Sequence, residues 1–154
     1  MVSIRRFKPT DVPQIAQLFH DTIRQVNIKD YSVDQVKAWA PDDLYFRDWE
    51  TKCSGMFTFI AEEKDMIVGF AELASNGYID CFYCHKDYQG KGVGTLLFKA
   101  IQQKATELNL DKLFAEVSIT AKPFFEKMGF NVQDKQTERV RGAYLQYYRM
   151  YMNL

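Results

Sequence analysis

The 154-residue sequence predicts an α/β fold, a mixed and mostly antiparallel sheet with helices on both faces, and three observations support this. Apolar residues alternate along the chain between a helical period of about 3.6 residues and a strand period of about two. A helix-length segment separates the strand-like segments 78–84 and 113–118, and such a crossover joins parallel strands. Short turns join most of the other strand-like segments, which favours antiparallel pairing. The length fits one domain, which we expect to span residues 1–154.

The first third of the chain predicts one strand and two helices. Residues 2–7 form an opening strand. A helix follows, with Thr10 or Asp11 as its N-cap, because short oxygen-bearing side chains satisfy the free N–H groups of a first helical turn. Ser32 is a second N-cap candidate, for a shorter helix. Residues 42–54 indicate a loop or a short helix.

Three strands and a glycine-rich turn come next. Met56–Glu62 and Met66–Ala74 are rich in β-forming residues, and the short polar segment between them predicts a hairpin. Asn76-Gly77 is typical of a two-residue hairpin turn and precedes a third strand, Tyr78–Cys84. A glycine-rich turn over 89–94 then leads into the crossover helix.

The remaining elements alternate between helix and strand. They are predicted in this order: a helix over 93–108, a strand over 113–118, a short helix over 121–128, and strands over 130–133 and 143–152. Gly129 suits the left-handed position that ends a helix. Lys135–Arg141, between the last two strands, predicts a charged hairpin.

Charge and composition exclude several classes of protein. The 20 Lys and Arg residues balance the 20 Asp and Glu residues, which argues against broad attraction to nucleic acid or to an anionic membrane. No apolar run approaches the roughly 18 residues that a membrane helix needs, and the N-terminus lacks the pattern of a signal peptide. With only three cysteines, we expect a cytoplasmic protein.

The segment Gln89-Gly90-Lys91-Gly92-Val93-Gly94, between a strand and a helix, predicts an anion site. Glycine lets the backbone approach a ligand closely, and the free N–H groups at a helix start attract phosphate. The segment matches neither the P-loop pattern nor the dinucleotide pattern GxGxxG. A nucleotide-binding protein therefore stays open only as a minor alternative.

Two blocks of sequence resemble those of the GNAT superfamily of N-acetyltransferases. Tyr83–Gly94 resembles its acyl-CoA signature, Q/R-x-x-G-x-G/A. Ser118–Phe130 resembles its block N-x-x-A-x-x-F-Y-E-K-x-G-F. One helix and one strand separate the two blocks, as in the family, and the order of elements agrees over nearly the whole chain. The resemblance implies the GNAT fold, in which the parallel strand pair splays apart at the CoA cleft.

The resemblance also implies the donor and the residues that hold it. The donor is acetyl-CoA, with no metal. The sequence leaves the oligomeric state open between a monomer and a homodimer. Backbone groups of Phe82–Cys84 would bind the pantetheine arm, and N–H groups from Gln89 to Thr95 would bind the pyrophosphate. The residues assigned to CoA are Phe82, Tyr83, Cys84, Gln89, Gly90, Lys91, Gly92, Val93, Gly94, Thr95, Ser118 and Phe125.

The reaction implied is direct acetyl transfer to a primary amine of a small molecule or peptide. Since such an amine is mostly protonated near neutral pH, a general base is expected. The tyrosine that often protonates the leaving thiolate is replaced here by Phe125, and Ser118 replaces the common asparagine. Tyr78 and Asp80 share one face of their strand and are the catalytic candidates. The weaker candidates are Glu72, Glu116, Tyr144, Tyr147 and Tyr148.

Four further interpretations stay open or are set aside. The missing phenol leaves room for an acyl-CoA-binding sensor without turnover. Cys81–His85 matches the haem pattern C-x-x-C-H, but Cys81 and Cys84 should face opposite sides of a strand, which excludes a shared metal site. Five aromatic residues have two open roles: to cover an acceptor pocket, as the resemblance implies, or to pack in the core. They are Tyr31, Trp39, Tyr45, Phe46 and Trp49. An acceptor-binding role for Arg139 or Arg141 also stays open.

Overall fold

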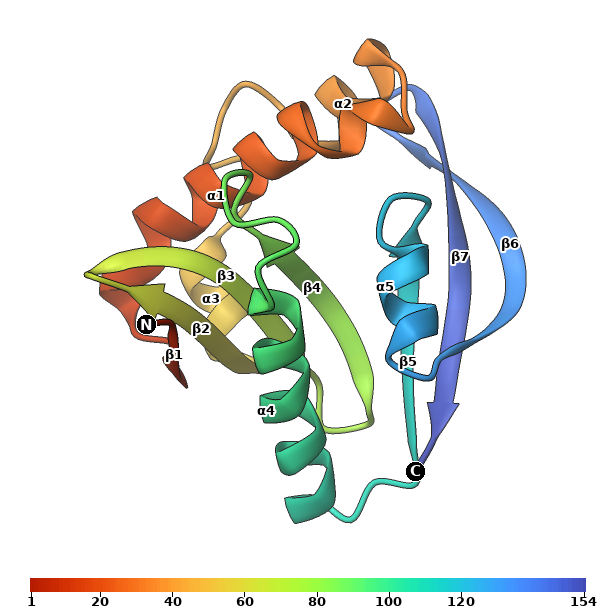
Figure 1. The fold of residues 1–154 in the computed structure, drawn as a ribbon. Helices are drawn as coiled ribbons and strands as arrows, with labels where there is room; N and C mark the ends of the chain where they lie inside the picture. Colours follow the sequence, from red (N-terminus) through yellow and green to blue (C-terminus); the bar gives the residue numbers. More distant parts are fainter.

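The computed structural model describes all 154 residues and contains one seven-stranded sheet with the order β1-β2-β3-β4-β5-β7-β6 (Figure 1). The strands are β1 (Ser3–Arg6), β2 (Phe57–Glu63), β3 (Met66–Leu73), β4 (Tyr78–Cys84), β5 (Lys112–Ser118), β6 (Asn131–Val140) and β7 (Ala143–Asn153). The α-helices are α1 (Val12–Gln25), α2 (Val33–Trp39), α3 (Trp49–Ser54), α4 (Val93–Glu107) and α5 (Lys122–Lys127). Only β4 and β5 pair in parallel. The predicted fold class is confirmed.

Each face of the sheet carries its own hydrophobic core. Helices α4 and α5 cover one face, where Leu97, Ile101 and Phe125 pack against strand residues such as Val68. Helices α1, α2 and α3 cover the other face, where Ile15 and Trp49 are among the buried residues. No helix is both long and apolar enough to cross a membrane.

Strands β4 and β5 separate soon after they begin. Only Tyr78 with Phe114 and Ile79 with Ala115 are paired between them. Beyond this point β4 carries a bulge, because two of its residues lie opposite Glu72 alone. In Figure 1 the two strands lie close at their lower ends and diverge toward α1. The divergence leaves a gap in the sheet between their carboxyl ends.

Several local predictions match the structure. Ser32 accepts a hydrogen bond from the Gln35 N–H (3.1 Å) and Gln35 bonds back, as in a capping box. The segment 42–54 contains a short helix, α3.

The turn before β4, in contrast, is not the predicted two-residue Asn76-Gly77 type. The Ala74 N–H bonds to the Tyr78 carbonyl (2.8 Å) and the Gly77 N–H to the Ala74 carbonyl (3.0 Å), so residues 75–77 form the loop, with Gly77 at φ +96°.

The last hairpin differs from its prediction. β6 continues to Val140, and the turn contains only Arg141 and Gly142, so Lys135–Val140 is strand and not loop. β6 is an edge strand whose side chains are largely exposed on both faces, so its sequence lacks the alternation that marks a half-buried strand.

Asp11 also acts differently from the N-cap that its position suggests. Its side chain makes no capping bond to α1. Each of its two carboxylate oxygens instead accepts a hydrogen bond from one of the two terminal guanidinium nitrogens of Arg5, at 2.8 Å. One of these oxygens also accepts the Lys8 N–H. Burial alone would raise the pKa of Asp11, but these partners hold it below its usual value.

We expect Asp11→Asn to lower the free energy of unfolding at pH 7 by about 2 kcal/mol, because it removes charge-assisted hydrogen bonds from a buried site. A depressed pKa means that the wild type keeps this contribution above the usual Asp pKa and loses it as pH falls through the folded-state value. The difference in free energy of unfolding between wild type and variant should therefore become smaller in acid. Urea unfolding across pH tests this, with Asp42→Asn, which affects only an exposed ion pair, as the control. A difference in free energy of unfolding that grew in acid would contradict the prediction.

Candidate active site

A cleft of about 310 Å³ opens where β4 and β5 diverge, between α1, the start of α4 and α5. We call it the glycine-loop cleft. All the residues that sequence analysis assigned to CoA line it except Lys91 and Val93. The Val93 side chain is 1% exposed and packs in the core, so only its backbone can reach a ligand. The Lys91 ammonium lies over the Tyr88 ring instead (5.2 Å).

The glycine loop leaves its N–H groups free. Gly90 and Gly92 adopt φ of +72° and +84°, and a Cβ at either would meet nothing within 4 Å. The Leu96 N–H bonds to the Gly92 carbonyl (3.2 Å), so the N–H groups just before it have no partner in α4. The Gln89 amide ties the loop to β4 by donating to the Cys84 carbonyl (2.8 Å). This geometry suits an anion.

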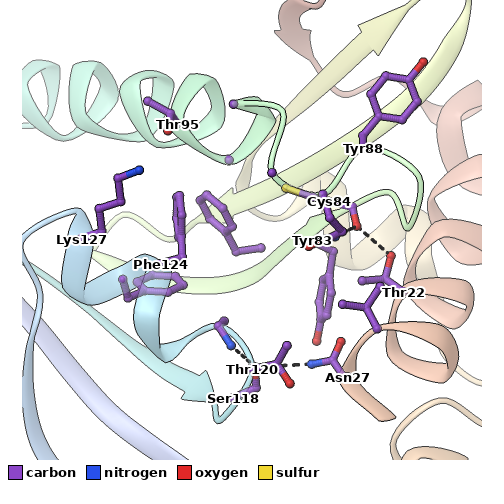
Figure 2. A pocket seen from close by; sticks show the side chains of 18 residues that line it. Thr22, Asn27, Tyr83, Cys84, Tyr88, Thr95, Ser118, Thr120, Phe124 and Lys127 are labelled. Carbon is purple, nitrogen blue, oxygen red and sulfur yellow. Dashed lines mark hydrogen bonds between the residues drawn. The ribbon is translucent and has the colours of Figure 1, made fainter. Parts of the chain in front are cut away.

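Aromatic rings and one lysine form the α5 side of this cleft. Phe125 is 3% exposed and packs against Phe82, Phe124 and Phe130, with ring centroids 5.4, 5.7 and 5.0 Å away. It contributes apolar surface and no proton donor. Lys127 also lines the cleft and belongs to no ion pair (Figure 2). It brings a positive charge close to the glycine loop.

Polar side chains from α1 and from the end of β5 face the same cleft. Thr22 donates to the Cys84 carbonyl (3.0 Å), and the Asn27 amide lies 3.4 Å from Ser118 Oγ. Ser118 Oγ also accepts the Ala121 N–H (3.0 Å). Thr120 Oγ1 is buried and has no hydrogen-bond partner in the protein. Thr22, Asn27 and Thr120 were not predicted from the sequence. Only Thr22 carried a usable signal, because it is a polar residue within the apolar stripe of α1.

A second cleft of about 360 Å³ meets the first, because Tyr83 and Ser118 line both. We call it the carboxylate cleft. Figure 2 shows the Tyr83 ring extending from β4 toward Thr120 and Asn27. Tyr78 and Asp80, the two catalytic candidates, both line the carboxylate cleft, and Glu116 from β5 joins them. Glu116 was only a weaker candidate from the sequence, because a solvated or edge position explains a strand carboxylate equally well.

Lys52 of α3 links Asp80 to the core. Its ammonium pairs with Asp80 Oδ2 (3.0 Å) and with Glu72, whose side chain is fully buried. Burial would lower the pKa of Lys52, but the surrounding Cys81, Glu72 and Asp80 raise it overall. Lys52 therefore stays charged and holds the Asp80 carboxylate at the cleft wall.

Burial raises the pKa values of several other groups that line the carboxylate cleft. Burial raises the pKa of Glu116, helped by Glu138 and Asp80 and opposed by Arg149. Burial also raises the pKa of Tyr78, with Asp80 and Glu116 adding to it, and that of Tyr83. Both phenols therefore stay protonated near neutral pH. The cleft combines carboxylates that can accept a proton with phenols that can donate a hydrogen bond.

The cysteines do not form a site of their own. All three are free thiols. Cys81 packs in the core beneath α1 and α3, whereas Cys84 packs on the α4 side, so the two face opposite sides of the sheet as predicted.

Four of the five aromatic residues that were predicted to cover an acceptor pocket or to pack in the core divide between these two roles. Tyr31 and Trp39 line the carboxylate cleft. Trp49 is 1% exposed in the core, and Phe46 packs against it and Phe19. Tyr45 is 55% exposed.

Comparisons with known proteins agree with this geometry. The chain is 32% identical over 143 residues to the uncharacterized N-acetyltransferase YafP of Escherichia coli K12, covering 93% of this chain and 90% of that protein. A GCN5-related N-acetyltransferase from Rhodopseudomonas palustris superposes with a TM-score of 0.92 at 33% identity, covering 99% of this chain and 95% of that one. PaiA N-acetyltransferase from Thermoplasma acidophilum, solved in complex with coenzyme A, superposes with a TM-score of 0.83 at 16% identity, covering 100% and 99%.

The sequence model of the GNAT acetyltransferase domain matches residues 27–153, which include both clefts except for Thr22 and Val26. Its match over most of the chain agrees with the diverging strands, the glycine loop and the two relatives above 30% identity. The chain belongs to the GNAT family and is an acyltransferase of the N-acetyltransferase type.

Proposed function

We propose that the protein transfers the acetyl group of acetyl-CoA directly to a primary amine of a small molecule or peptide, as one catalytic domain spanning residues 1–154. The observation that carries the proposal is the junction of the two clefts at Tyr83 and Ser118. Direct transfer requires donor and acceptor to lie side by side, and the two clefts offer that arrangement.

The glycine-loop cleft suits acetyl-CoA, which supplies an activated acetyl thioester. Free N–H groups at the start of α4 and the unpaired Lys127 would hold its phosphates. PaiA, which shares the fold, was solved with coenzyme A. The orphaned Thr120 hydroxyl offers a donor for a polar group of the pantetheine arm or its thioester.

The carboxylate cleft suits the acceptor amine. In the overall reaction a carbon–nitrogen bond forms, the carbon–sulfur bond breaks, and the amine loses a proton as the CoA thiolate leaves. Asp80 and Glu116 are proposed to receive the amine proton, because both carboxylates line the cleft. The raised pKa of Glu116 makes it a better base than an ordinary glutamate. Tyr83 is proposed to donate a hydrogen bond to the thioester oxygen or the departing sulfur, and Tyr78 to orient the amine.

A covalent route through the protein is disfavoured. Cys84 is the cysteine that lines the glycine-loop cleft. Burial raises the pKa of its thiol to about 11, so the nucleophilic thiolate is scarce near neutral pH.

The alternative is an acyl-CoA sensor without turnover. Phe125, which removes the usual phenol, favours it. Incubation with acetyl-CoA and a panel of amines, followed by thiol detection, separates the two. CoA release that depends on an amine supports the enzyme. Tight CoA binding without release from any amine supports the sensor.

We expect Gly92→Asp to weaken CoA binding about tenfold or more, because the new carboxylate would point into open space beside the glycine loop and repel phosphate. Gly142→Asp is the matched control, since Gly142 has φ of +85° and nothing within 4 Å of its Cβ, yet does not line this cleft. Calorimetry and CoA-induced thermal shifts measure both variants. Equal affinity in the two variants would contradict the loop assignment.

We expect Asp80→Asn and Glu116→Gln each to lower kcat/KM. The variant that removes the main base should lower it by roughly 100-fold. Because the Glu116 pKa is raised, wild-type kcat/KM should fall as pH drops through a value above the usual Glu range. If Glu116 is the base, this fall in kcat/KM at low pH should be absent from Glu116→Gln. Glu107→Gln, at an exposed position near the end of α4, is the control. Unchanged kcat/KM in both cleft variants would exclude carboxylate catalysis here.

We expect Tyr83→Phe to lower kcat by roughly 100-fold while CoA affinity stays the same, because the variant loses only the phenol oxygen. Tyr144→Phe, at a side chain 62% exposed, should have no effect. Steady-state kinetics with calorimetry of CoA binding tests this. A Tyr83→Phe enzyme with wild-type kcat would remove the phenol from the mechanism.

A further inference from the structure

Two arginines of the carboxylate cleft have no carboxylate partner. Arg47, from the loop between α2 and α3, and Arg141, from the β6–β7 turn, both line the cleft. Neither takes part in any ion pair of the protein. Two like charges from distant segments are thus brought to one cavity without neutralisation.

Both guanidinium groups are held against the same aromatic ring. The Cζ atoms of Arg47 and Arg141 each lie 4.7 Å from the Phe46 ring centroid. Arg47 also lies over Phe19 (5.3 Å) and Trp49 (4.9 Å). Stacking fixes a guanidinium while leaving its N–H donors free. The only hydrogen bond that either side chain makes is from Arg141 to the Ala38 carbonyl (2.7 Å).

The backbone at Arg141 points to a role beyond the turn. Arg141 and Gly142 have φ of +45° and +85°, the pattern of a two-residue hairpin turn that favours Asn-Gly. Arginine is a poor choice at positive φ. A residue that breaks a local rule inside a cleft suggests that its side chain serves the cleft.

The rest of the cleft has the opposite charge. Asp80, Glu116 and Glu138 line it, and Asp80 and Glu138 each raise the pKa of Glu116, so these carboxylates lie near one another. Asp80 is neutralised by Lys52, but Glu116 and Glu138 belong to no ion pair. The cleft therefore presents free positive and negative side chains together. Its volume of about 360 Å³ lies within the range of small-molecule sites.

We propose that the acceptor is an amine that also carries an anionic oxyacid group, a carboxylate or a phosphate, which Arg47 and Arg141 bind while the amine faces Asp80 and Glu116. The inference rests on the proposed function and names its substrate class. Guanidinium groups recognise carboxylate and phosphate through paired N–H donors, which explains why arginine and not lysine stands at both positions.

The test compares matched amines as acceptors with acetyl-CoA. The pairs are phenylalanine and phenethylamine, lysine and cadaverine, and phosphoethanolamine and ethanolamine. We expect kcat/KM to be about tenfold or more higher for the anionic member of at least one pair. The first two pairs report on carboxylate and the third on phosphate.

Arg141→Asn provides the decisive variant, because it creates the favoured Asn-Gly turn and should leave the melting temperature unchanged or raised. It should lower kcat/KM for anionic amines about tenfold and leave their neutral partners unaffected. Arg47→Lys, which keeps the charge but not the planar fork, should lose part of the preference. Arg139→Asn is the control, since Arg139 precedes the same turn but does not line the cleft.

The possible failures are distinguishable. Two results would overturn this inference and leave the proposed acetyltransferase activity intact. One is equal kcat/KM for neutral amines and their anionic partners. The other is an equal loss of kcat/KM for both kinds of amine in Arg141→Asn. Acetyl-CoA binding without transfer to any of the six amines would contradict both.

Discussion

The separation of β4 from β5 is the constraint on which both clefts depend. Two residue pairs hold the strands together, and the bulge opposite Glu72 then turns β4 away. Beyond that point the edge of β4 that faces β5 has no strand partner. A sheet normally satisfies these backbone groups with a neighbouring strand, so the gap has to be supported by other means. Thr22 and Gln89 supply part of that support, because both donate to the Cys84 carbonyl.

The bulge at this divergence is also linked to an ion pair inside the fold. Glu72 sits opposite the bulge and is fully buried, which is costly for a carboxylate without a partner. Lys52 neutralises it and reaches on to Asp80 at the cleft wall. The bulge, a buried ion pair and a carboxylate facing solvent are thus one connected arrangement, and α3 is fixed to β4 through it.

The sequence predicted several features that depend on local chemistry. The bounds of β4, the Ser32 cap and the glycine loop all follow from short-range preferences, and the structure agrees with each. The length of β6 was missed because an exposed edge strand has no buried face to impose alternation. The carboxylate cleft was missed in part because its residues come from four separate stretches of chain. The parallel pairing of β4 and β5 was predicted, but the register that brings Glu116 near Asp80 was not. The meeting of Arg47 with Arg141 cannot be deduced before the packing of the α2–α3 loop against the β6–β7 turn is known.

The two clefts are built from different stretches of chain, and this separates how each can change. Apart from the end of α1, the glycine-loop cleft is formed by the continuous region from β4 to α5. The stretches 31–47 and 138–147 line only the carboxylate cleft. Substitution, insertion or exchange within these two stretches can therefore alter the recognised amine while the donor half stays intact. Tyr83 and Ser118 belong to both clefts, so they are the positions where such a change of specificity would disturb both substrates at once.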